Sequence, residues 1–131
     1  MLSAIGVDSR TVARGSLFFA LPGARADGHD FLADVVAAGA HAVLRADYPV
    51  DKLPTGGHFL RVDNVLDALG RFAAAYRATL PTRMVGVTGS VGKTSTKEII
   101  ADLLCTLGKT GRTVGNYNNE IGLPLSVAAL D

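Results

Sequence analysis

The stretch MVGVTGSVGKTSTKEII, residues 84–100, passes from an apolar run through glycines into helix-forming residues. This strand–loop–helix order is typical of a phosphate-binding loop. The strict pattern G-x-x-x-x-G-K-[ST] would place its first glycine at position 87, which is Val87 here. What remains is Thr-Gly-x-x-Gly-Lys-Thr, so the sequence predicts a phosphate loop with altered spacing.

The chemistry of such a loop survives the altered spacing. Gly89 and Gly92 permit backbone angles, and a close approach to a ligand, that a Cβ atom would block. Successive backbone N–H groups then surround an anion at the positive end of the following helix. Lys93 can reach terminal phosphate oxygens, and Thr94 offers a hydroxyl to Mg²⁺. The alternative is a glycine-rich turn with an exposed lysine, which leaves the order of strand, loop and helix unexplained.

The remainder of this half predicts a βαβ unit. Residues 84–87 predict a strand, 92–107 a helix, 113–114 a short strand and 121–130 a further helix. Strand–helix–strand implies parallel strands joined by a right-handed crossover. We therefore expect 81–131 to be the incomplete beginning of a P-loop domain with a parallel sheet. The helix residues expected to face that sheet are Ile99, Ile100, Leu103, Leu104 and Leu107.

The first half of the chain predicts a small α/β domain. Short apolar runs predict four strands, at 4–7, 17–21, 41–44 and 59–62. One helix is expected to begin with Asp30 as its N-cap and to stop at Gly39, and an apolar stripe predicts a second helix over 65–80. Pro81 ends that pattern, so we place the domain boundary between 1–80 and 81–131.

Composition narrows the function classes. The chain has 131 residues, 48% hydrophobic and 19% charged, which is typical of globular proteins. The net charge of +1 is spread over both halves, so general nucleic-acid binding has no support. A single cysteine, Cys105, favours a reducing compartment and is expected to be buried. Since no signal peptide or membrane-length apolar run is recognisable, we expect a soluble cytoplasmic protein.

Three segments together resemble one enzyme family. They are VTGSVGKTSTKE at 87–98, GNYNNEIGLPLS at 115–126 and DSRTVARGSLFFALPGARADGHDF at 8–31. They resemble the Mur ligases, the ATP-dependent amide-bond-forming enzymes of peptidoglycan synthesis, whose loop reads T-G-x-x-G-K-[TS]. The resemblance covers nearly the whole chain. Within the family it favours members that join D-Ala-D-Ala to a UDP-N-acetylmuramoyl-tripeptide by way of an acyl phosphate, using ATP and Mg²⁺.

The resemblance also implies roles for individual residues. Lys93 is the expected catalytic residue, and Thr94 and Glu120 are the expected Mg²⁺ ligands. The alternative for Glu120 is a solvated loop carboxylate. The expected ATP-binding residues are Gly89, Ser90, Val91, Gly92, Lys93, Thr94 and Ser95, with Val91 at a position where many members have asparagine.

The expected contacts to the UDP-substrate come from separate segments, at Ser9, Arg10, Thr11, His29 and Asn119. Serine and threonine hydroxyls and an arginine fork suit a nucleoside diphosphate. The alternative for the first three is a turn led by Asp8, with Arg10 on the surface. His29 could instead help to cap a helix, and Asn119, like Asn116 and Asn118, could be an ordinary turn residue.

Family members of this kind have three domains, so the resemblance implies a fragment: the UDP-substrate domain, its start shortened, and the opening of the central domain. We expect such a fragment not to complete turnover alone, and its partial sheet to be marginally stable or to dimerise. Three other functions stay open at this point: a non-catalytic module that binds a UDP-sugar or nucleotide, a different P-loop enzyme, and a Mur ligase that adds another amino acid.

Overall fold

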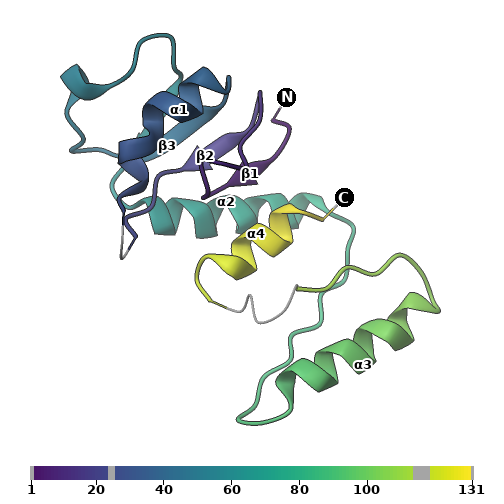
Figure 1. Ribbon diagram of the computed structural model, residues 1–131. Coiled ribbons are helices and arrows are strands. Elements are labelled where there is room, and N and C mark those ends of the chain that lie inside the picture. Colours follow the sequence, from purple (N-terminus) through teal and green to yellow (C-terminus); the bar gives the residue numbers. More distant parts are fainter. Residues whose placement is uncertain (1, 24–25, 114–118, 131) are drawn as a thin grey trace. The chain divides into compact units, whose positions relative to one another are not determined.

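A computed structural model describes residues 2–23, 26–113 and 119–130 (Figure 1). The chain divides into two compact units, Met1–Phe72 and Ala73–Asp131, which are described separately below. The long helix α2 (Val65–Thr79) belongs to both of them. The domain boundary placed after residue 80 stays a prediction.

The first unit is built on a four-stranded parallel sheet with strand order β1-β2-β3-β4. The strands are β1 (Ile5–Gly6), β2 (Leu17–Phe19), β3 (His41–Arg45) and β4 (Phe59–Val62). All three pairs are parallel, as Figure 1 shows for β1 to β3, and each strand follows its neighbour in the chain. The predicted α/β fold is confirmed, and all four predicted strands of this half are present.

The connections after β2 and after β3 contain short helical segments. They include the 3₁₀ turn η1 (Gly28–Phe31), the helix α1 (Leu32–Ala37) and the 3₁₀ turn η2 (Val50–Lys52). The prediction that Asp30 is an N-cap is wrong. Asp27 accepts the hydrogen bond from the backbone N–H of His29 instead, because the chain enters the helix through the 3₁₀ turn and not directly. At the other end of α1, Gly39 has φ +75°, which favours glycine at a helix terminus.

Successive residues of β2 are buried on opposite faces of the sheet. Phe18 is 1% exposed and packs in a cluster with Leu32 and Val35 of α1. The next residue, Phe19, is also 1% exposed, and its ring lies 6.0 Å from that of Phe72 on α2 in an edge-to-face arrangement. Because successive strand residues point to opposite faces, both faces of the sheet are covered by helix.

The second unit contains the end of α2 together with α3 (Lys93–Cys105) and α4 (Gly122–Ala128). The predicted strand at 84–87 is wrong, because these residues have no regular secondary structure. Thr113 is likewise outside any strand, and Val114 lies outside the described residues. An isolated strand leaves its backbone donors and acceptors unpaired, and no described segment of this unit pairs with 84–87.

Without that sheet, much of the side of α3 that was expected to be buried is exposed to solvent. Ile99 and Leu103 are 61% and 64% exposed, whereas Ile100 and Leu104 are half-buried. Leu107, which follows the end of α3, is 84% exposed. Cys105 is exposed as well, so the expectation of a buried thiol is wrong for the same reason. No described helix combines the length and apolarity that a membrane crossing requires.

Candidate functional site

The loop that precedes α3 has the backbone that a phosphate-binding loop needs. Gly89 has φ +146° and Gly92 has φ +80° and ψ 0°, so both lie in the region that favours glycine. Gly92 is the N-cap residue of α3, and no side chain of the described residues caps this helix. The first amides of α3 therefore lack a side-chain cap at the positive end of a helix of 13 residues.

The side chain of Lys93 folds back over this loop. Its ammonium group donates a hydrogen bond to the carbonyl oxygen of Gly89 and lies 3.5 Å from that of Ser90. Val91 is 90% exposed, and Thr94 and Ser95 are also exposed. The ammonium, the loop backbone and the start of α3 thus lie together on an open surface, where they could surround an anion.

The two predicted Mg²⁺ ligands are both exposed. Thr94 lies in the first turn of α3, and Glu120 lies in the turn before α4. Both offer the hard oxygen atoms that Mg²⁺ prefers, so their chemistry fits the ion. Among the described residues, no group of three or more His, Cys, Asp or Glu side chains could hold a metal.

Asn119 has a local structural role. Its side-chain oxygen accepts hydrogen bonds from the backbone N–H groups of Ile121, at 3.3 Å, and Gly122, at 2.6 Å, where α4 begins. Its side-chain NH₂ group has no part in these bonds. Asn116 and Asn118 lie outside the described residues.

The segment after β1 forms a turn led by Asp8. The guanidinium of Arg10 donates from Nε to Oδ1 at 2.9 Å and from Nη2 to Oδ2 at 2.6 Å, and Thr11 donates to the Asp8 carbonyl. The hydrogen bond from the Arg10 side chain lowers the pKa of Asp8 to about 2. Ser9 lies half-buried between these two residues. The turn follows the carboxyl end of a parallel strand, the edge where α/β sheets bind ligands.

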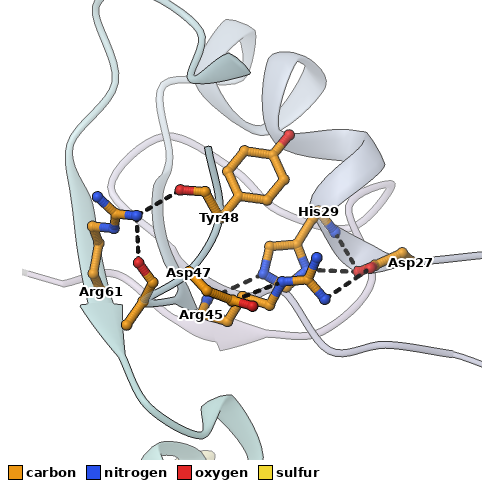
Figure 2. Close-up of polar contacts among 7 residues, drawn as sticks. Asp27, His29, Arg45, Asp47, Tyr48 and Arg61 are labelled. Atoms are coloured by element: carbon orange, nitrogen blue, oxygen red, sulfur yellow. Dashed lines mark hydrogen bonds and ion pairs between the residues drawn. The ribbon is translucent and has the colours of Figure 1, made fainter. Parts of the chain in front are cut away.

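His29 is buried, with an exposed fraction of 3%. Figure 2 shows its ring between Asp27 and the end of β3. Nδ1 lies 2.6 Å from the carboxylate of Asp27, and Nε2 lies 3.1 Å from the backbone nitrogen of Arg45. The ring also stacks on Tyr48 with centroids 5.2 Å apart. Burial raises the pKa of Asp27, but the bonds from the His29 amide and ring, with help from Arg45, outweigh it and lower that pKa below its usual value.

The sequence interpretation overlooked the partners of His29. Arg45 pairs with Asp47 at 3.1 Å and lies 3.9 Å from Asp27, and Arg61 donates to the carbonyls of Ala46 and Tyr48. One signal was available. Two of these residues, Arg45 and Asp47, come directly after the apolar run 42–44 of β3, as ligand-edge residues do in parallel sheets.

Comparison with known proteins matches each half of the chain to one family. Residues 2–77 match the profile described as "Mur ligase family, catalytic domain", and residues 87–131 match "Mur ligase middle domain".

Two curated relatives at more than 40% identity share the same name. A UDP-N-acetylmuramoyl-tripeptide–D-alanyl-D-alanine ligase of Bacillus subtilis is 42% identical over 99% of this chain, and one of Escherichia coli is 43% identical over 98%. The chain spans 28% of the length of each of these relatives.

Solved structures agree with this. MurF of Acinetobacter baumannii superposes with a TM-score of 0.88 at 36% identity, over 99% of this chain and 28% of its own. MurF ligase of Thermotoga maritima in complex with ADP gives 0.81 at 35% identity, over 95% of this chain and 28% of its own. The profile over 2–77 covers more than half of the residues, and with these relatives it shows that the chain belongs to the Mur ligase family.

Proposed function

We propose that this chain supplies the UDP-substrate-binding and phosphate-binding parts of a cytoplasmic ATP-dependent ligase. That ligase joins D-Ala-D-Ala to a UDP-N-acetylmuramoyl-tripeptide. The names of the relatives support the reaction, and the ADP in the Thermotoga maritima complex supports nucleotide use. The other Mur-type and P-loop functions have no comparable support.

The observation that carries the proposal is the loop at the start of α3. Two glycines with positive φ, an uncapped helix terminus and the ammonium of Lys93 meet at one exposed place. Backbone N–H groups of this loop would hold the terminal phosphates of ATP. The Lys93 ammonium would then donate to phosphate oxygens in place of the loop carbonyls that it now contacts. Both would stabilise the charge that develops on a phosphoryl group in transfer.

Thr94 and Glu120 would hold Mg²⁺ beside this loop. The ion, when bound, would neutralise phosphate charge and orient the transferring group. The Thr94 hydroxyl suits this role because it is exposed in the first turn of α3. Glu120 suits it as an exposed carboxylate.

The UDP-substrate would bind at the carboxyl edge of the sheet in the first unit. Ser9, Arg10 and Thr11 are the proposed contacts, because they form the exit loop of β1. The Arg10 fork now binds Asp8 and would present the same two donors to a diphosphate. Asn119 is a further proposed contact, because its side-chain NH₂ group takes no part in the hydrogen bonds to Ile121 and Gly122.

Calorimetric titration tests the proposal with two ligands, Mg-ATP and the UDP-N-acetylmuramoyl-tripeptide. Lys93→Ala is expected to weaken Mg-ATP binding by about tenfold or more, as for the loss of a charged hydrogen bond, and to leave UDP-substrate binding unchanged. Lys52→Ala, which removes an exposed lysine of η2, is the matched control and should change neither affinity. UDP-substrate binding without Mg-ATP binding would favour a non-catalytic module. An affinity for Mg-ATP that does not change in Lys93→Ala would contradict the assigned phosphate site.

A further inference from the structure

The hydrogen bonds around His29 fix where its ring proton lies. The backbone N–H of Arg45 can only donate, so Nε2 of His29, 3.1 Å away, must accept and carries no proton. A neutral imidazole then has its proton on Nδ1, which faces the Asp27 carboxylate at 2.6 Å. Both nitrogens of this buried ring are therefore engaged within the protein, and no donor or acceptor is left for a substrate.

These bonds join the exits of two neighbouring strands. Asp27 and His29 follow β2, whereas Arg45 ends β3. The stacking of the His29 ring on Tyr48 adds a second contact to the loop after β3. Arg61 of β4 donates to the Tyr48 carbonyl at 2.5 Å, as Figure 2 shows, and it also donates to the carbonyl of Ala46.

The charge of the cluster does not favour an anionic ligand. The carboxylates of Asp27 and Asp47 both face the single guanidinium of Arg45. Arg61 of β4 adds a second positive group, so these four charged side chains carry no net positive charge that would attract a diphosphate. These charged residues around His29 are therefore better suited to stabilising the edge of the sheet than to binding the substrate directly.

We propose that His29 is a positioning residue that latches the exit loops of β2 and β3 together, and that it does not touch the UDP-substrate. This inference rests on the proposed function for the location of the substrate at this edge. His29 acts on the substrate site through the backbone of Arg45 and the ring of Tyr48.

Heteronuclear NMR of the unmodified chain tests the latch without any ligand. We expect the His29 ring to carry its proton on Nδ1, and a scalar coupling across the hydrogen bond between the Arg45 amide and Nε2. A ring protonated on Nε2, or the absence of that coupling when other long-range couplings are resolved, would overturn the proposal. This result does not depend on whether the chain binds any nucleotide.

Two variants test the positioning role. His29→Ala removes the acceptor, and we expect the Arg45 amide to exchange with solvent about tenfold faster. His29→Gln keeps an acceptor on a side chain of similar reach, so it should restore most of the protection. With Gln in place, the affinity for the UDP-N-acetylmuramoyl-tripeptide should stay within about twofold of the unmodified chain, because no substrate contact is lost.

A His29→Gln variant that keeps its Arg45 protection but loses tenfold or more in UDP-substrate affinity would show direct contact, and the proposal would fail. If the unmodified chain binds no UDP-substrate, the proposed function fails. The ring proton and the coupling then still decide whether the latch exists.

Discussion

Gly92→Ala isolates the contribution of one backbone position to phosphate binding. Gly92 adopts φ +80° and ψ 0° at the N-cap of α3. A left-handed conformation costs a residue with a Cβ atom about 1–2 kcal/mol. No atom lies within 4 Å of an ideal Cβ at this position, so no steric clash adds to that cost. Replacing a glycine also lowers the conformational entropy of the unfolded chain, and this effect stabilises the folded state by about 0.4–1 kcal/mol.

The expected net loss of stability is therefore small, at most about 1.6 kcal/mol. Nucleotide binding should suffer more, because the same open space must admit phosphate close to the backbone. We expect the affinity for Mg-ATP to fall by about tenfold or more. Calorimetry measures the affinity, and urea unfolding followed by circular dichroism measures the stability.

Gly70→Ala is the matched control for this experiment. Gly70 lies inside α2 without a positive φ, and an ideal Cβ there also meets no atom within 4 Å. Alanine should stabilise this helix by about 0.5–1 kcal/mol and leave Mg-ATP binding unchanged. If Gly92→Ala binds Mg-ATP as tightly as the unmodified chain, the phosphate does not approach this backbone and our reasoning is refuted.

Three further predictions concern the first unit. Leu44→Ala, at a fully buried β3 position, should cost about 2–5 kcal/mol in urea unfolding, and a cost below about 1 kcal/mol would mean that this core is not formed. Arg10→Ala should raise the pKa of Asp8 from about 2 towards its usual 3.8, as followed by NMR, and an unchanged pKa would exclude the ion pair. Since the folded pKa is the lower one, the stability that this pair contributes is present above pH 3.8 and is lost as the pH falls towards 2. Asn64→Ala should destabilise α2 by about 1 kcal/mol in the same urea assay, because Asn64 caps its first amides, whereas no change would show that the cap contributes nothing.

The first unit could be predicted from the sequence because its strands pair with one another. Runs such as residues 41–44 are apolar, short and followed by polar residues, and each finds a parallel neighbour within the first 62 residues. The second unit could not be predicted in this way. Residues 84–87 have the composition of a strand, but a strand forms only where another backbone accepts its hydrogen bonds.

The phosphate loop was recognisable because its chemistry lies within seven consecutive residues, 88–94. The latch around His29 was not, because Asp27, Arg45 and Tyr48 come from separate segments that only the folded sheet brings together. A histidine beside an aspartate in the sequence is equally compatible with a substrate contact and with a helix cap. Only burial and the occupied ring nitrogens distinguish those roles.

An NMR titration of the chain with Mg-ATP, followed at the backbone amides, tests the phosphate-binding assignment most directly. We predict saturable shifts that centre on residues 89–94 and that require about tenfold or more nucleotide in Lys93→Ala. Shifts confined to other residues, or none at millimolar nucleotide, would contradict the assignment of this loop as the place where ATP phosphates bind.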